Sequence, residues 1–184
     1  QPLEEKSITI ARSRTSLTFP ANFQLVASMN PCPCGNLGNP HAECSCTPQQ
    51  VQKYMARISG PLLDRIDIHV EVAAVRYRDL AAKRGGESSM DVRRRVVAAR
   101  DIQSARFSRR RDLFKNADMN SRDIANWCTI DAVGAEILKT AMQKIGLSAR
   151  AYDRIQKVAR TIADLAGSEA IEPAHLSEAI QYRS

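Results

Sequence analysis

Residues 147–167 read LSARAYDRIQKVARTIADLAG, and this stretch predicts a long amphipathic helix. Ser148 is a residue type that caps helix N-termini, and Gly167 is typical of the position just after a helix end. Between them the apolar residues recur every three or four positions: Tyr152, Ile155, Ala159, Ile162 and Leu165.

Helical spacing of apolar residues also occurs before and after this stretch. Ser89 is suited to cap a helix that continues to Phe107. Gly146 is suited to end a helix through Leu138, and Pro173 occupies the favoured first turn of a last helix. The other apolar positions of these three helices are Val92, Val96, Ala99, Val133, Ile137, Ala141, Ile145, Leu176, Ala179 and Ile180.

The first part of the chain has strand patterns. Residues 7–19, SITIARSRTSLTF, alternate on either side of a polar tip, which predicts a β-hairpin. Residues 23–29, FQLVASM, form an apolar run typical of a strand buried on both faces, and residues 65–72, RIDIHVEV, alternate like a half-buried strand. Residues 48–59, PQQVQKYMARIS, have helical spacing.

These patterns predict a predominantly helical protein in three parts. We expect residues 1–76 to be the C-terminal part of an α/β core with few strands and a hairpin. Residues 77–88 are expected to be a linker, because glycine and serine gather in KRGGESS at 83–89. Residues 89–184 are expected to form an all-α domain.

Composition is that of an ordinary soluble protein: 184 residues, of which 43% are hydrophobic and 26% charged. No apolar run approaches the roughly 20 residues of a membrane helix, and the first ten residues lack the pattern of a signal peptide. The chain lacks an initiator Met and starts in what reads as mid-helix, so we expect it to be part of a longer protein.

The net charge of +7 is concentrated in one stretch. Residues 76–115 hold thirteen basic and five acidic side chains, whereas the rest of the chain is close to neutral. Such an excess is typical of a segment that faces a polyanion such as DNA, and equally of a solvated helix and linker. Composition alone does not choose between these two interpretations.

Five cysteines occur, and four of them follow the pattern C-x-C-x9-C-x-C at Cys32, Cys34, Cys44 and Cys46. Four thiolates within 15 residues can wrap a tetrahedral zinc ion, with His41 as a substitute ligand; the alternative is four reduced cysteines without metal. Four cysteines leave no open position on the ion, so any metal is expected to be structural. An odd number of cysteines without an export signal indicates the reducing cytoplasm, and Cys128 is expected to fill the core.

Three stretches together resemble one family: residues 16–35, SLTFPANFQLVASMNPCPCG, residues 56–72, ARISGPLLDRIDIHVEV, and residues 147–167. They are similar to the magnesium-chelatase-like AAA+ ATPases of the ComM/YifB type, and the resemblance is weakest over 76–130. It implies an AAA+ core remnant followed by a helical lid. It also implies a bacterial cytoplasmic ring ATPase, hexameric, that uses ATP and Mg²⁺ and acts on single-stranded or branched DNA.

The resemblance also implies roles for three polar residues. Asn30 matches the sensor 1 residue, whose carboxamide can bind the γ-phosphate or orient the attacking water. Arg65, in GPLLDRID, matches the arginine finger that reaches the neighbouring subunit's nucleotide, with Arg57 as a weaker candidate. Arg150, in LSAR, matches the sensor 2 arginine and falls in a helix first turn, where anions are favoured.

Each of these assignments has a simpler alternative. An asparagine before Pro31 also suits a turn, and Arg65 lies between two acids, Asp64 and Asp67, with which it can form an internal ion pair. The hairpin arginines, Arg12 and Arg14, match an insertion that points into the ring's pore and contacts DNA; ordinary solvated turn charges explain them equally. Six further arginines form a diffuse basic surface without interleaved aromatics: Arg93, Arg94, Arg95, Arg109, Arg110 and Arg111.

Two parts of a nucleotide site are absent from the sequence. No G-x-x-x-x-G-K-[ST] motif and no apolar strand ending in paired acids occurs, so this chain alone is expected to neither hydrolyse ATP nor bind it tightly. The leading hypothesis is the C-terminal part of an ATP-driven DNA helicase or branch-migration motor linked to natural transformation and recombination. The alternatives are a magnesium-chelatase-like remodelling ATPase subunit and a zinc-stabilised, non-enzymatic DNA-binding module.

Overall fold

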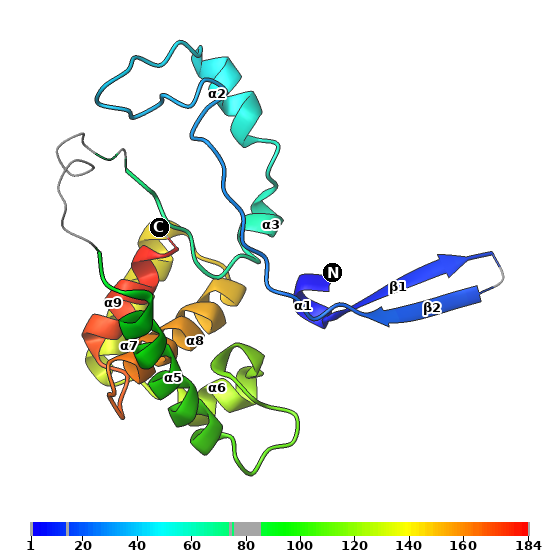
Figure 1. The fold of residues 1–184 in the computed structure, drawn as a ribbon, viewed down its shortest axis with the longest axis vertical. Helices are drawn as coiled ribbons and strands as arrows, with labels where there is room; N and C mark the ends of the chain where they lie inside the picture. The colour runs from blue at the N-terminus through cyan, green and yellow to red at the C-terminus, as the bar shows by residue number, and fades with distance from the viewer. Residues whose placement is uncertain (1, 14, 74, 76–85, 184) are drawn as a thin grey trace. The chain divides into compact units, whose positions relative to one another are not determined.

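The computed structural model describes residues 2–13, 15–73, 75 and 86–183 (Figure 1). Its chain divides into two compact units, residues 1–66 and residues 67–184, which we call unit 1 and unit 2. The protein is predominantly helical with a small β part, as the sequence predicts. No helix in the described ranges is long and apolar enough to cross a membrane.

Unit 2 is a helical bundle (Figure 1). Its elements are α5 (Ser89–Arg106), the 3-10 helix η1 (Asn116–Asp118), α6 (Ser121–Trp127), α7 (Ala132–Ile145), α8 (Ala149–Leu165) and α9 (Pro173–Gln181). The predicted helices of this region are therefore confirmed. The cap of α5 differs by one position, because Ser88 rather than Ser89 accepts the hydrogen bond from the Asp91 backbone N–H.

The apolar core of unit 2 forms around α8, the helix predicted by residues 147–167. α8 packs against α5, η1, α6 and α9, and α7 packs against α9. The buried cluster consists of Phe107, Leu113, Met119, Ile124, Cys128, Leu138, Ile155, Ala159, Ala163, Ile171, Leu176 and Ala179. The expected start and end of α8 are also observed: the Ser148 Oγ accepts from the Ala151 backbone N–H at 3.2 Å, and Gly167 has a φ of 68°.

A buried ionic network fastens α5 and η1 to α8. The Asp164 carboxylate, with a fully buried side chain, accepts hydrogen bonds from Arg106 (2.8 Å), Asn116 (2.8 Å) and Arg160 (3.0 Å). Arg160 also donates to the backbone carbonyls of Ser168 and Glu169, at the end of α8. Each buried charge of this network is paired and hydrogen-bonded, so the network links α5 and η1 to α8 without leaving an unpaired buried charge of its own.

Unit 1 contains α1 (Pro2–Glu5), β1 (Ser7–Arg12), β2 (Thr15–Pro20), α2 (Pro48–Met55) and α3 (Gly60–Leu63). The predicted hairpin is present, and the helix predicted over 48–59 forms but ends at Met55. Thr47 caps α2 through a capping box with Gln50, which explains why the helix begins there.

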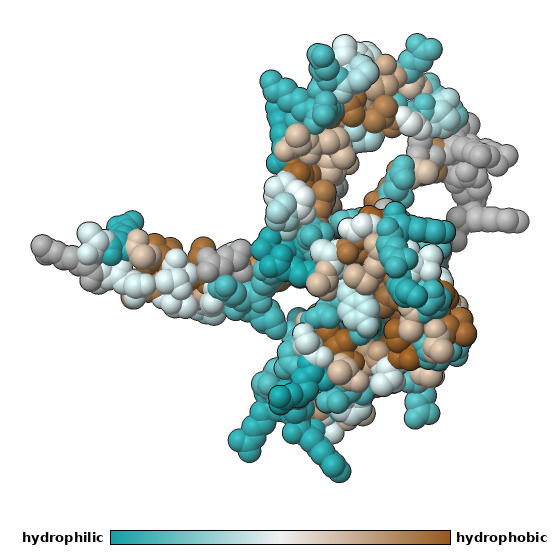
Figure 2. Space-filling view, turned by 180° about the vertical axis from the view of Figure 1, so that it is seen from behind, coloured by the Kyte–Doolittle hydropathy of each residue, from teal (hydrophilic) through white to brown (hydrophobic). Residues whose placement is uncertain are grey.

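The hairpin has one apolar face that is exposed. β1 and β2 pair antiparallel, with Ile8 opposite Phe19 and Ile10 opposite Leu17. These four side chains are 40–59% exposed, and Figure 2 shows hydrophobic residues along the hairpin. The hairpin is therefore held by its own hydrogen bonds and cross-strand pairs rather than by a core.

Two predicted strands are wrong in this structure. Residues 23–29 and 65–72 form no strand, and their apolar side chains are exposed apart from the half-buried Ile66, with Val26 at 83% and Val72 at 85%. A strand exists only where a neighbour supplies backbone hydrogen bonds, and β1 with β2 is the one ladder among the described strands. The apolar patterns of these segments favour strand pairing, but no partner strand for them is present among the described residues.

Candidate functional site

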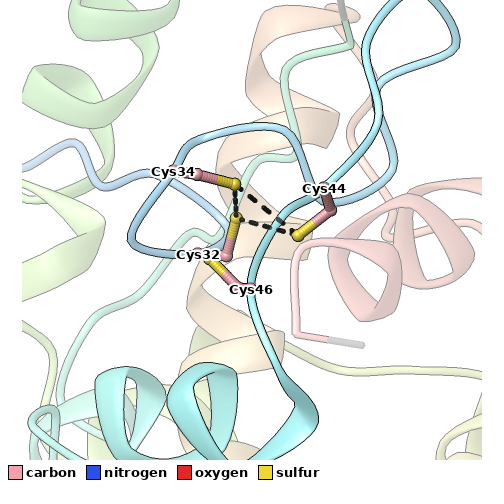
Figure 3. Close-up of side chains that lie close together, drawn as sticks. All are labelled: Cys32, Cys34, Cys44 and Cys46. Atoms are coloured by element: carbon pink, nitrogen blue, oxygen red, sulfur yellow. Dashed lines mark hydrogen bonds between the residues drawn. The ribbon is translucent and has the colours of Figure 1, made fainter.

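The four cysteines of the C-x-C-x9-C-x-C pattern converge on one point in unit 1 (Figure 3). Their Sγ atoms all lie within 4.8 Å of one another. The closest contacts are 3.4 Å between Cys32 and Cys34, 3.6 Å between Cys34 and Cys44, and 3.7 Å between Cys32 and Cys44. All four, including Cys46, are free thiols. The structure therefore brings together the residues that the spacing singled out.

The separations of these sulfurs suit a tetrahedral metal ion. Four thiolates each about 2.3 Å from one ion lie about 3.8 Å apart, close to the three shortest separations here. A four-sulfur tetrahedron is typical of zinc or an iron–sulfur centre. The substitute ligand, His41, is outside the group of clustered ligand atoms; its backbone N–H donates to the Asn39 side chain at 2.8 Å.

Local backbone geometry forms the sulfur cluster. The Gly35 N–H donates to the Cys32 carbonyl at 3.0 Å, closing a turn in which Gly35 has a φ of 82°. Gly38 follows with a φ of 78°, a region that glycine adopts without steric cost. The Leu37 N–H donates to the Cys32 sulfur at 3.4 Å. Backbone donors of this kind stabilise thiolates and orient metal ligands.

Electrostatics within the cluster separate two of the thiols. The pKa of Cys34 is lowered to about 5, first by the Asn36 backbone N–H and then by its sulfur neighbours. A hydrogen bond from the Cys34 backbone N–H favours the Cys46 thiolate. Partial burial and the adjacent sulfurs outweigh it and raise the pKa of Cys46 to about 12. Crowded thiols resist a second negative charge, and a bound dication removes that repulsion.

Asn30 stands two residues before the first cysteine. Its side chain is exposed and lies over the Gly35 turn: a Cβ atom built on Gly35 would be 3.7 Å from the Asn30 Nδ2. The carboxamide therefore lies within van der Waals reach of any side chain placed at position 35. Its role as the sensor 1 residue stays a prediction.

Arg65, the predicted arginine finger, follows the short helix α3. Its Nε lies 3.1 Å from the Glu4 carboxylate, and its Nη1 donates to the Pro61 carbonyl at 2.8 Å. The Glu4 partner was not apparent from the sequence, which offered Asp64 and Asp67 instead. The finger role stays a prediction.

Arg150, the predicted sensor 2 residue, is exposed in the first turn of α8, as expected. One turn later Arg154 forms an ion pair with Asp67 and leaves Asp153 to accept from the Ser121 hydroxyl. Burial lowers the pKa of Lys157, and the nearby positive charge of Arg154 lowers it further. Arg150 belongs to unit 2, whereas Asn30 and Arg65 belong to unit 1, so their shared nucleotide site stays a prediction.

The predicted DNA contacts are partly described. Arg12 is exposed at the end of β1, and Arg14 lies outside the described residues. In the basic surface of unit 2, Arg94, Arg95 and Arg110 each pair with an acid. The predicted linker over 77–88 lies mostly outside the described residues, and the domain boundaries stay predictions.

Comparisons with known proteins cover nearly the whole chain. Residues 86–183 match the family model described as "Magnesium chelatase, subunit ChlI C-terminal", and residues 1–80 match "Magnesium chelatase, subunit ChlI". The two matches meet in the region where the sequence resemblance was weakest.

Similar curated proteins include Competence protein ComM of Haemophilus influenzae, 44% identical over 185 residues. The uncharacterized protein YifB of Escherichia coli is 42% identical over 185 residues, and an uncharacterized protein of Mycobacterium tuberculosis is 34% identical over 182 residues. The alignments take in 99–100% of this chain and 35% of each relative. The chain thus spans about a third of the length of the relatives it matches.

Proposed function

Because the chain belongs to the magnesium chelatase subunit ChlI family, within the ComM/YifB group of AAA+ proteins, we propose that it is the C-terminal part of an ATP-driven DNA motor. The observation that carries this proposal is the 44% identity to a competence protein across the entire chain. Competence involves transforming DNA, and a helicase or branch-migration activity would serve it. The full-length protein would act as a cytoplasmic hexameric ring.

The division of labour in such a motor follows from the side chains. ATP and Mg²⁺ would be held mainly by motifs that this sequence lacks, and the residues of this chain would act on the phosphates. Asn30 would orient the γ-phosphate or the attacking water, and Arg150 would bind phosphate oxygens in the anion-favouring first turn of α8. Arg65 would offset transition-state charge in a neighbouring subunit, an effect worth about 10³-fold or more in rate.

The test uses the full-length protein. We expect Arg65→Ala to lower the kcat of ATP hydrolysis by about 10³-fold while ATP binding persists, since a trans finger acts on the transition state. Arg150→Ala is expected to weaken ATP binding as well. Lys139→Ala is the control, because Lys139 is exposed and pairs only with Glu136 of its own helix among the described residues. Wild-type ATPase activity in Arg65→Ala would contradict the finger assignment.

DNA binding separates the motor from its alternatives. Affinity that falls steeply with salt and favours branched over duplex DNA is expected for the motor, because phosphate contacts release counterions. No DNA binding by the complete hexamer would favour a chelatase-like remodelling ATPase. A full-length protein without ATPase activity would favour a zinc-stabilised binding module.

We also propose that the four clustered cysteines bind one structural Zn²⁺. The support is the set of sulfur separations and the absence of an open coordination position in a four-thiolate site. Metal analysis of the purified chain is expected to give one zinc per chain, and none after all four residues are changed to serine. Cys128→Ala is the control, because this buried cysteine belongs to unit 2 and should leave the zinc content unchanged. Iron in place of zinc would contradict the zinc assignment.

A further inference from the structure

The cysteine loop has little besides its sulfurs to order it. Among the described residues of unit 1, Cys32 is the one buried side chain. Residues 31–46 contain two backbone–backbone hydrogen bonds, from the Gly35 N–H to the Cys32 carbonyl and from the Asn39 N–H to the Asn36 carbonyl. A loop without apolar burial cannot offset its conformational entropy unless a metal ion cross-links it.

Asn30 is attached to this loop in two ways. Only Pro31 separates it from Cys32 in the chain, and its carboxamide is 3.7 Å from the position that a Cβ on Gly35 would take. That turn is closed by the backbone of Cys32, and the Leu37 N–H is bonded to the Cys32 sulfur. Whatever fixes the first pair of cysteines therefore also fixes the turn that lies beside the Asn30 side chain.

We infer that the metal-binding cysteine loop positions Asn30, so that occupancy of the four-thiolate site controls the orientation of this carboxamide. The inference rests on the proposed function, because the positioned group is the proposed sensor 1 residue. In the metal-bound loop the Gly35 turn closes one side of the Asn30 amide. Without the ion the turn keeps only its own hydrogen bond, and the amide is expected to sample a wider range of orientations. Cysteine residues thereby act on phosphate chemistry without touching the nucleotide.

The magnitude of the effect follows from the tolerance of catalytic geometry. A displacement of about 1 Å in a group that orients a reactant can cost about 10²-fold in rate. Ground-state binding of ATP depends far less on one amide. Metal loss is therefore expected to lower kcat and to leave KM nearly unchanged. A loop that served only to hold unit 1 together would instead change both constants or abolish folding.

The first experiment observes Asn30 directly. In the 184-residue chain labelled with ¹⁵N-asparagine, the Asn30 side-chain NH₂ signals are assigned with an Asn30→Gln variant. Zinc addition to the metal-free chain is expected to shift them and to leave unchanged those of Asn126, an exposed residue of α6 in unit 2. Unchanged Asn30 signals in a chain that binds one zinc would overturn the inference alone. Failure to bind any stoichiometric metal would overturn the inference together with the zinc site.

Two glycines provide a matched pair of variants that keep all four thiols. Gly35 and Gly38 both have positive φ, so alanine strains the backbone similarly at either position. An added Cβ at Gly35 would contact the Asn30 amide, whereas one at Gly38 meets nothing within 4 Å. We expect both variants to retain zinc and only Gly35→Ala to shift the Asn30 signals. Equal Asn30 shifts in the two variants would overturn the inference, because loop strain alone would then explain them.

The kinetic experiment uses the full-length protein and a double-mutant cycle. The Cys44→Ser/Cys46→Ser variant is expected to lower kcat about tenfold or more, with KM for ATP changed less than threefold. In an Asn30→Ala background the same cysteine changes should lower kcat no further, because their effect passes through the missing amide. Losses that multiply would overturn the inference. Absence of ATPase activity in the wild type, with zinc-dependent Asn30 signals, would refute the motor and leave the positioning intact.

Discussion

The two units of this chain are stabilised by different means. Unit 2 buries a cluster of twelve apolar residues around α8 and a fully paired carboxylate at Asp164. Unit 1 buries one described side chain, Cys32, and exposes the apolar face of its hairpin. The comparison shows that the apolar helix faces of unit 2 find their packing partners within unit 2 itself. Unit 1 relies on local caps, a hairpin ladder and the sulfur cluster.

Metal removal should give the largest difference between the units. We expect a chelator to abolish amide protection over residues 31–47, because metal-binding free energy is folding free energy for a loop without a core. Protection in α7, α8 and α9 should not change. Hydrogen exchange followed by mass spectrometry measures both units in one sample. Loss of protection in unit 2 would show that its core is not self-sufficient.

The next effect is expected in the ionic network of unit 2. Asp164→Ala leaves Arg106 and Arg160 buried without their carboxylate and should lower the free energy of unfolding by about 3–5 kcal/mol. Urea titration of helical circular dichroism measures it. Glu136→Ala, which breaks an exposed pair with Lys139, is the control and should cost less than about 1 kcal/mol. Equal costs would mean that the buried network adds nothing specific.

A smaller effect is expected where α7 approaches α9. A Cβ on Gly134 would lie 2.6 Å from the Cδ1 of Leu176, a fully buried side chain. Gly134→Ala should therefore destabilise unit 2 by about 1–3 kcal/mol through overpacking, although alanine favours helices. Thermal unfolding compares it with Gly86→Ala, whose Cβ meets nothing within 4 Å. A raised melting temperature in Gly134→Ala would show that this core has room.

The smallest effect concerns acid. Burial opposes ionisation of Asp164, but its hydrogen bonds from Arg106 and Asn116 prevail and lower its pKa. A folded-state pKa below the unfolded value of about 3.9 stabilises unit 2 above about pH 4, and this stability is lost as pH falls through the folded value. Each unit of lowering is worth about 1.4 kcal/mol. Urea titrations between pH 7 and pH 3 should show a shallower acid decline in Asp164→Asn.

Sequence reasoning succeeded where the signal is local. The 3.6-residue period, Ser148 and Gly167 predicted α8, because caps and periodicity depend on neighbours along the chain. The cysteine spacing likewise predicted one cluster. The two predicted elements that failed were strands, since the apolar runs at 23–29 and 65–72 specify pairing without specifying a partner.

Long-range ion pairs were also missed. Asp67 and Arg154 are 87 positions apart, and nothing in either local pattern links them. One signal was available in the ionic network: Arg160 and Asp164 are four residues apart on one helix, the spacing at which side chains meet. That Arg106 and Asn116 complete the network depends on how α5 and η1 pack, which periodicity does not encode.

The hairpin face with Ile8, Ile10, Leu17 and Phe19 has a practical consequence for handling this molecule. A two-stranded hairpin with an exposed apolar face is expected to self-associate, through that face and through its unpaired strand edges. Pairs of chains should therefore accumulate as concentration rises, and a lysine at Phe19 should disperse them. Sedimentation at a single concentration would not distinguish this self-association from ring assembly. Any mass determination should therefore include a dilution series with the Phe19→Lys variant.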